Sequence, residues 1–195
     1  MERAAEVTRE TRETRVTVRV NLDGTGQHEV STGVPFLDHM LTQVAVHGLM
    51  DFTILAQGDV QVDDHHTVED VGIVLGQAMR RALGDGSGLV RYGCALIPMD
   101  EALALVAVDL SGRSYLAYDA QFGQETIGRF EAQLLEEFLR ALTAHAGITL
   151  HVRVLAGRNS HHMAEAMFKG LGRALREATA LDPRRLGVPS SKGEL

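Results

Sequence analysis

The feature that most constrains this chain is a five-residue segment that occurs twice with the same pattern. His65–Glu69 (HHTVE) returns as His161–Glu165 (HHMAE), so each copy has two adjacent histidines and a glutamate three residues after the second one. Each copy opens a stretch in which apolar residues recur at spacings of three and four, which is typical of a helix with one buried face. Asp63-Asp64 and Asn159-Ser160 precede the copies, and such residues favour helix N-caps. Two such helices indicate an internal duplication.

The rest of the chain repeats in the same order as these segments. Glu13–Gly24 ends in Asn-Leu-Asp-Gly and Glu101–Gly112 ends in Asp-Leu-Ser-Gly, at an offset of 88 residues, whereas the histidine pairs lie 96 residues apart. Loop insertions explain such a difference. Gly84–Gly88 is the clearest break in composition, so we place the boundary between the halves there, with the first half at residues 1–88 and the second at 89–195.

Hydrophobic patterns predict similar elements in both halves. The first half shows a strand at Arg15–Leu22, a hairpin partner at Gln27–Ser31, a helix from Leu37 to a C′ glycine at Gly48, and strands at Phe52–Ala56 and Val60–Val62. The second shows a strand at Tyr115–Ala120, a helix from Leu134 to Gly147 and a strand at Ile148–Leu155. The predicted fold class is α+β, a tandem duplication of a strand-strand-helix-strand-helix unit with the helices on one face of each sheet. Two such halves either pack helix layer on helix layer or join their sheets.

The two histidine pairs indicate metal binding. Neighbouring side chains on a helix diverge by about 100°, so one ion does not easily take both members of a pair. Two pairs with two glutamates therefore suggest two ions, each taking one histidine from each copy. His39 lies 26 residues before His65, and Glu137 lies 24 residues before His161, so each ion is expected to gain a third ligand from the preceding helix. The alternatives are a capping or surface histidine for His39 and a solvated helix face for Glu137.

The donor types narrow the choice of metal. Imidazole and carboxylate ligands without thiolate suit manganese, iron(II) or zinc. Several carboxylates and no cysteine in the site favour manganese, so the expected cofactor is Mn²⁺.

Several basic residues are candidates for binding an anion. Lys169 follows Glu165 by four residues, where it forms either a surface salt bridge or an anion-holding site beside the metals. Arg91 and Arg113 lie at the start and in a turn of the second half, either as solubilising residues or as a phosphate clamp. The tail from Gly187 to Gly193 offers hydroxyls, backbone N–H groups and an ammonium, which also suit an anion.

The composition excludes several classes of partner and location. The formal net charge is −7 and the pI is about 5.7, which argues against non-specific binding to nucleic acid. No apolar run approaches the length that spans a membrane, and the first 19 residues lack the apolar core of a secretory signal. Cys94 is the only cysteine, which fits a reducing cytoplasm. We expect a cytoplasmic protein with no membrane partner.

Four motifs in order give the chain a family resemblance. They are HHTVED at His65–Asp70, FLDHML at Phe36–Leu41, NSHH with a following FK at Asn159–Lys169, and PSSKG at Pro189–Gly193. With these motifs the chain resembles the imidazoleglycerol-phosphate dehydratase family of histidine biosynthesis, from Glu13 to Lys192. It has no room for the phosphatase domain fused to some relatives, so a monofunctional form is expected.

The resemblance implies a site for two manganese ions and a small phosphate-bearing substrate. The implied metal ligands are His39, His65, His66, Glu69, His161, His162 and Glu165, with Glu137 at an eighth position where family members often carry histidine. The implied phosphate contacts are Arg91, Arg113, Lys169, Ser190 and Lys192, and the other substrate contacts are Glu13 and Gln43. The resemblance also implies a homo-oligomer of 24 subunits built around trimers, with sites shared between subunits.

The family reaction removes water from imidazole glycerol phosphate and gives imidazole acetol phosphate. The proton to be lost sits on an unactivated carbon, and two Lewis-acidic ions flanking the imidazole ring would stabilise an imidazolate. Our hypothesis is that Glu165 moves the carbon-bound proton and that Glu13 acts as acid or base near the leaving hydroxyl, or that these roles are exchanged.

Two rival functions fit parts of the sequence. A binuclear metallohydrolase acting on a phosphate ester would release inorganic phosphate, whereas dehydration leaves the phosphate attached. A duplicated metal-storage or structural shell protein would not explain the basic residues Arg91, Arg113, Lys169 and Lys192.

Overall fold

The first half of the chain forms a four-stranded sheet with two helices on one face. In the computed structural model, which describes residues 3–193, its elements are β1 (Ala4–Glu10), β2 (Thr14–Asn21), β3 (His28–Ser31), α1 (Pro35–Gly48), β4 (Asp51–Gly58) and α2 (His65–Leu83). The strand order is β1-β2-β4-β3. β2 is antiparallel to both neighbours, and β3 runs parallel to β4 at the edge.

The second half repeats this sheet with one insertion. Its elements are β5 (Tyr92–Met99), β6 (Ala102–Asp109), β7 (Tyr115–Asp119), β8 (Thr126–Ile127), β9 (Phe130–Glu131), α3 (Gln133–Ala146), β10 (Thr149–Ala156) and α4 (Ser160–Thr179). The strand order β5-β6-β10-β7 matches that of the first sheet, with the same directions. The small hairpin β8–β9 lies between β7 and α3, where the first half has only a short connection, so it is the insertion.

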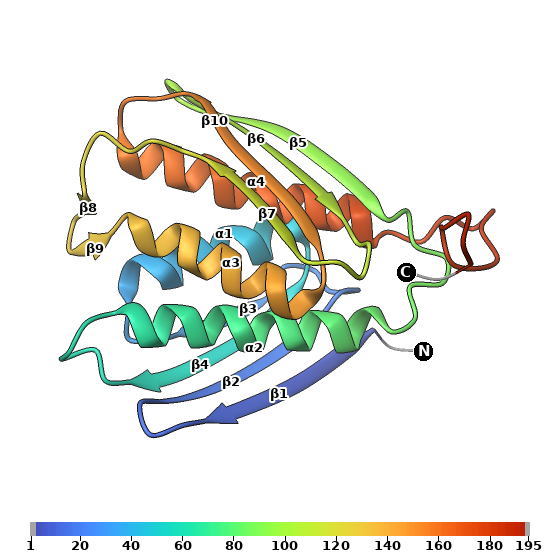
Figure 1. The fold of residues 1–195 in the computed structure, drawn as a ribbon, viewed down its shortest axis with the longest axis horizontal. Helices are drawn as coiled ribbons and strands as arrows, with labels where there is room; N and C mark the ends of the chain where they lie inside the picture. The colour runs from blue at the N-terminus through green and yellow to red at the C-terminus, as the bar shows by residue number, and fades with distance from the viewer. Residues whose placement is uncertain (1–2, 194–195) are drawn as a thin grey trace.

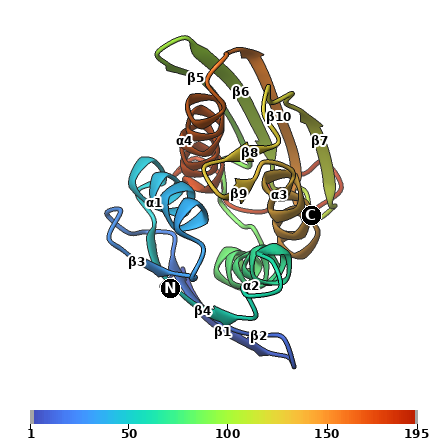
Figure 2. The same cartoon turned by 90° about the vertical axis from the view of Figure 1, so that its left-hand side faces the viewer.

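The two sheets lie on the outside and the four helices form the layer between them (Figures 1 and 2). Of the two arrangements left open by the sequence, helix layer on helix layer is the one observed. The helices pair across the halves, since α1 packs against α4 and α2 packs against α3. The hydrophobic core runs through both halves and includes alternate residues of β2, namely Val16, Val18 and Val20.

Glycines allow these cross-half helix pairs to approach closely. A Cβ atom at Gly72 of α2 would lie 2.8 Å from the carbonyl oxygen of Phe138 on α3. On the other pair, a Cβ atom at Gly172 of α4 would lie 2.7 Å from the carbonyl oxygen of Val44 on α1. Both distances are shorter than a Cβ atom tolerates, so any side chain at these positions would push the helices apart.

The structure confirms the α+β duplication and corrects several details of the sequence analysis. Each unit begins with an additional strand, β1 or β5, which the patterns did not reveal. The segment Gln27–Ser31 is not a hairpin partner of β2, because β3 pairs with β4 in parallel. Val60–Val62 is a turn rather than a strand, closed by the N–H of Val62 donating to Asp59.

One predicted helix end also differs. Gly48 is the last residue of α1, and Leu49 takes the left-handed conformation that follows it, with φ of 51°. Gly48 is instead needed for packing, because a Cβ atom there would lie 3.2 Å from the carbonyl oxygen of Gly172. No helix within residues 3–193 is both long and apolar enough to cross a membrane. The division of the chain at residues 88 and 89 stays a prediction.

We expect Gly72→Leu to destabilise the fold by about 1–3 kcal/mol, because the new side chain would separate α2 from α3. The measurement is the urea midpoint of unfolding. Gly123→Leu is the matched control, since a Cβ atom at Gly123 meets nothing within 4 Å. Equal midpoints for the two variants would contradict the close packing of α2 on α3.

Candidate metal centre

Three potential metal ligands gather where α1 meets α4. His39 on α1 and His161 and Glu165 on α4 each offer one ligand atom, and these three atoms lie within 4.8 Å of one another. The Oε2 atom of Glu165 is 3.2 Å from Nε2 of His161 and 3.5 Å from Nε2 of His39. Two imidazoles and one carboxylate at such distances suit a divalent ion. The first half thus supplies one donor and the second half supplies two.

The N-cap of α4 holds its two histidines in the first helical turn. The Oδ1 atom of Asn159 accepts the backbone N–H groups of His161 and His162, as the sequence predicted. The two rings then diverge, with centroids 6.4 Å apart and planes at 88°. His65 and His66 diverge in the same way, at 6.3 Å and 87°. The members of each pair therefore face different surroundings.

Glu165 is a buried carboxylate stabilised by a neighbouring cation. Its residue is 8% exposed, and its Oε1 atom is 2.7 Å from Nζ of Lys169. Burial raises the pKa of Glu165, but the hydrogen bond and charge of Lys169, helped by His39, outweigh burial, so the pKa lies below its usual value. Lys169 is thus part of the site rather than a surface salt bridge, with its side chain 19% exposed.

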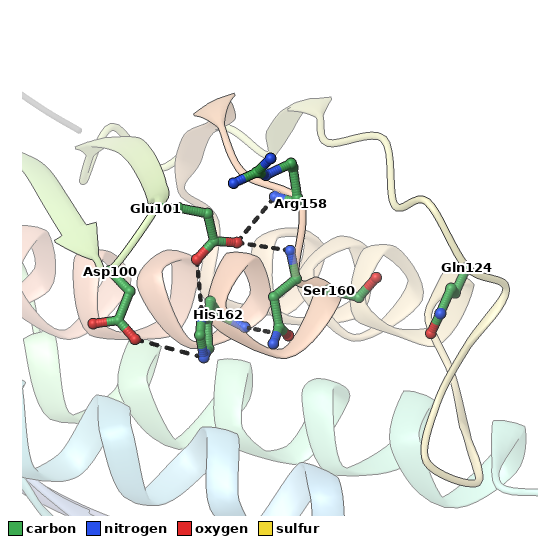
Figure 3. A pocket seen from close by; sticks show the side chains of 7 residues that line it. Asp100, Glu101, Gln124, Arg158, Ser160 and His162 are labelled. Carbon is green, nitrogen blue, oxygen red and sulfur yellow. Dashed lines mark hydrogen bonds and ion pairs between the residues drawn. The ribbon is translucent and has the colours of Figure 1, made fainter.

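His162 faces a second carboxylate, Glu101, at the turn between β5 and β6 (Figure 3). Its Nδ1 atom is 2.8 Å from Oε2 of Glu101, and its Nε2 atom is 3.8 Å from Oδ2 of Asp100. The other oxygen of Glu101 accepts the backbone N–H groups of Arg158 and Asn159. The hydrogen bond from His162 and these two backbone donors lower the pKa of Glu101 to about 2.

The two histidines of the first half, His65 and His66, each lie near a carboxylate of the same half. His66 has its Nδ1 atom 3.1 Å from Oδ2 of Asp59, and His65 has its Nε2 atom 3.9 Å from Oε2 of Glu69. His65 lines a cavity of about 760 Å³ together with His39 and His161.

Glu137 is the counterpart of His39 on the other helix pair. It lies on α3, where its carboxylate is 3.7 Å from Nε of Arg140 and its side chain is 38% exposed. The close cluster formed by His39, His161 and Glu165 includes neither Glu137 nor Glu69.

The candidate substrate-binding residues fall into two separated groups. Gln43 lies beside the cluster, with Nε2 3.5 Å from Nδ1 of His39. Arg91 lies at the far end of α4, where its backbone N–H donates to Ala178. Since α4 rises about 1.5 Å per residue, the 17 residues from His161 to Ala178 span about 25 Å. Figure 1 shows the C-terminal tail at that same far end.

Arg91 ties the tail to the second sheet. Its guanidinium donates to both oxygens of Asp109 and to the carbonyl oxygen of Pro189. It is therefore a largely buried structural arginine as well as a candidate phosphate contact, with its side chain 11% exposed. Ser190 and Lys192 follow directly in the tail.

The other two candidates are more exposed. The side chain of Arg113 donates to the carbonyl oxygen of Ser111, in the turn before β7. Glu13 lies in the turn between β1 and β2. The hydrogen bond to Asp59 is the main cause that raises the pKa of His66, and the nearby charge of Glu13 raises it further.

Sequence reasoning missed three carboxylates that lie beside the histidines, namely Asp59, Glu101 and Asp100. The sequence repeat could have identified Glu101, since this residue occupies the position in the second half that is equivalent to Glu13. Asp59 carried no such signal, because it falls between the two predicted strands Phe52–Ala56 and Val60–Val62, and the second of these is a turn in the structure.

The fold and the site together define a duplicated α+β protein with a histidine and carboxylate cluster suited to a divalent ion. The family model of imidazoleglycerol-phosphate dehydratase matches residues 32–175. The chain therefore belongs to the imidazoleglycerol-phosphate dehydratase family, as the motifs indicated, and is a hydro-lyase of histidine biosynthesis.

Individual relatives agree over the full length. The imidazoleglycerol-phosphate dehydratase of Moorella thermoacetica is 57% identical over 195 residues, covering all of both chains. That of Symbiobacterium thermophilum is 58% identical and covers all of this chain and 93% of its own. The crystal structure from Staphylococcus aureus is similar with a TM-score of 0.84 at 40% identity, covering 92% of this chain and 99% of its own. The structure from Pyrococcus furiosus has the same TM-score at 39% identity, covering 97% and 100%.

We expect Lys169→Met to lower the unfolding free energy of the metal-free protein by about 1–3 kcal/mol at neutral pH, because Glu165 would keep a buried charge without its partner. The folded-state pKa of Glu165 is lowered, so its stabilising effect is complete above the ordinary value of 4.5 and is lost as the pH falls through the folded-state pKa. The difference between variant and parent should shrink below pH 4.5. Urea unfolding across this range measures it, with Lys169→Arg as the charge-conserving control. A difference that does not change with pH would contradict the ion pair.

Proposed function

We propose that this chain converts imidazole glycerol phosphate to imidazole acetol phosphate and water at a site that holds two manganese ions. The observation that carries the proposal is the cluster of His39, His161 and Glu165 on the scaffold of this family. The dehydratase class fits better than a phosphate-ester hydrolase or a storage protein, because the dehydratases that match this chain cover all of it and are themselves covered over 93–100% of their length.

The donors of this structure fit the proposed ions. The cluster offers nitrogen and carboxylate oxygen without thiolate, and the only cysteine, Cys94, lies on β5 away from it. Such a set favours manganese among the divalent ions considered. The proposed ligands are His39, His65, His66, Glu69, Glu137, His161, His162 and Glu165. Glu137 has to leave Arg140 in order to ligate, which costs little because exposed ion pairs contribute about 1 kcal/mol or less.

Two carboxylates are proposed to move protons. When bound, the two ions supply Lewis acidity that stabilises negative charge on the imidazole ring of the substrate. In our assignment Glu165 takes the carbon-bound proton and Glu13 donates a proton to the leaving hydroxyl. The ion pair with Lys169 makes Glu165 a weaker base, so the exchanged roles are the second arrangement. Glu13 has an exposed side chain and is therefore accessible to a substrate.

The phosphate contacts support a site built from more than one subunit. Lys169 lies near the metal cluster, whereas Arg91 and the tail residues Ser190 and Lys192 lie about 25 Å away along α4. A substrate of this size does not span that distance, so the distal contacts have to come from a neighbouring copy. This geometry agrees with the proposed 24-subunit assembly. We also propose a cytoplasmic location, since a reducing compartment suits a chain with one cysteine.

Manganese-loaded protein incubated with imidazole glycerol phosphate should form the ketone product while inorganic phosphate stays at background. Removal of the metal with a chelator should abolish turnover, and added manganese should restore it, because Lys169, the cation beside the cluster, is already paired with Glu165 and does not replace two ions at the substrate ring. Ketone formation by absorbance and a phosphate-release assay are the two measurements. Release of phosphate in step with substrate loss would favour the hydrolase instead.

Glu13→Gln should lower turnover by about 10²–10⁴-fold, the usual contribution of a positioned acid or base. Its manganese affinity should stay at the parent value, because Glu13 is not among the proposed ligands. Glu10→Gln is the matched control, being an exposed glutamate at the end of the same hairpin. Full turnover by Glu13→Gln with metal bound would remove Glu13 from the mechanism.

A further inference from the structure

We propose that Asp59 and Glu101 are positioning residues that fix the ring tautomers of His66 and His162, so that each Nε2 atom keeps a free lone pair for a metal ion. The proposal rests on the proposed function only in that it takes these histidines to be metal ligands. It adds two residues to the site that are neither ligands nor substrate contacts.

In the second half the two oxygens of Glu101 have different partners. Oε2 lies 2.8 Å from Nδ1 of His162, while Oε1 accepts the N–H groups of Arg158 at 3.0 Å and Asn159 at 2.7 Å (Figure 3). An ionised carboxylate only accepts hydrogen bonds, so Nδ1 of His162 has to be the donor. In the neutral ring the proton is then on Nδ1, and Nε2 carries the lone pair that a metal ion needs.

The first half reaches the same result with a different residue. Nδ1 of His66 lies 3.2 Å from Oδ1 and 3.1 Å from Oδ2 of Asp59. This carboxylate also fixes the proton on Nδ1 and leaves Nε2 free. Asp59 follows β4, whereas Glu101 precedes β6, so the two halves use positions that are not equivalent.

The equivalent of Glu101 in the first half is Glu13, since each residue directly precedes the second strand of its sheet. Within residues 3–193, no hydrogen bond or ion pair engages the Glu13 carboxylate, and its backbone oxygen accepts the N–H of Asp59. Asp59 thus takes over the contact to the histidine and leaves Glu13 free. This explains why only the first copy of this carboxylate is available as an acid or base.

Replacing the carboxylate by an amide is expected to change the tautomer of His162 but not that of His66. In Glu101→Gln only an oxygen can accept from Arg158 and Asn159, so the NH₂ group has to face His162. That group donates to Nδ1 and forces the ring proton onto Nε2, which blocks the metal. In Asp59→Asn, neither carboxylate oxygen has another donor in the described part of the chain, so the amide can turn its oxygen toward His66. The tautomer of His66 is then kept.

The test measures the tautomer directly and without metal. Protein labelled with ¹⁵N-histidine, stripped of metal and held well above the ordinary histidine pKa, is examined by magic-angle-spinning ¹⁵N NMR. The His66 and His162 signals are assigned from His66→Asn and His162→Asn variants. Wild type should show both rings protonated on Nδ1. Glu101→Gln should invert the ring of His162, and Asp59→Asn should leave that of His66 unchanged.

Manganese affinity, measured by the EPR signal of free Mn²⁺, gives the second readout. Loss of such supporting contacts weakens metal binding by about 10–100-fold, so Glu101→Gln should fall in that range and Asp59→Asn should stay within a few fold of the parent. Asp119→Asn is the control, because that carboxylate lies on the edge strand β7 and, among the described residues, pairs only with Arg153.

Three results would overturn the proposal. They are wild-type rings protonated on Nε2, an unchanged His162 tautomer in Glu101→Gln, and parent-like manganese affinity in that variant. If Glu101→Gln does not fold, the wild-type spectrum decides by itself. The tautomer is read without substrate or metal, so it stands or falls independently of whether the protein dehydrates imidazole glycerol phosphate.

Discussion

The candidate site depends on how closely α1 approaches α4. His39 belongs to one half of the chain and His161 and Glu165 to the other, so they meet only where these two helices touch. Gly48 and Gly172 make the contact possible, because either side chain would meet the backbone of the opposite helix. A displacement of an ångström at this contact is enough to open a ligand cluster whose atoms lie within a few ångströms of one another.

The carboxylates around the histidines differ in their hydrogen-bond and ion-pair partners. Glu165 is held by Lys169, and Glu101 is held by two backbone N–H groups and a histidine. Asp59 has only His66 among the described residues, and Glu13 has no side-chain partner there. Carboxylates with fixed partners suit orienting and ligating roles, since their geometry is set before any ligand arrives. Glu13, without such a partner among the described residues, is free to turn toward a substrate.

The sequence predicted those parts of the fold that local patterns encode. The alternation of β2, the helical spacing after each histidine pair and the repeated order of segments in the two halves revealed the duplication and the helices that carry the site. β1 and β5 escaped notice because their buried positions are few or small: only Val7 is buried in β1, and Gly93 and Ala95 are buried in β5. The parallel pairing of β3 depends on a distant strand and has no local signal. The contact of Asp59 with His66 likewise depends on how the turn after β4 folds back.

The candidate ligands lie on helix pairs that join the two halves, and this suggests why two copies of the unit were fused into one chain. A single copy of the unit would carry an α1-type helix and an α4-type helix, but it would have to meet a second copy to bring them together. Joining two copies in one polypeptide replaces that encounter with an intramolecular contact at high effective concentration. It also frees the copies to diverge. In a dimer of identical units every substitution appears on both sides, whereas the fused chain keeps the Glu101 carboxylate bound to a histidine while its counterpart, Glu13, is free.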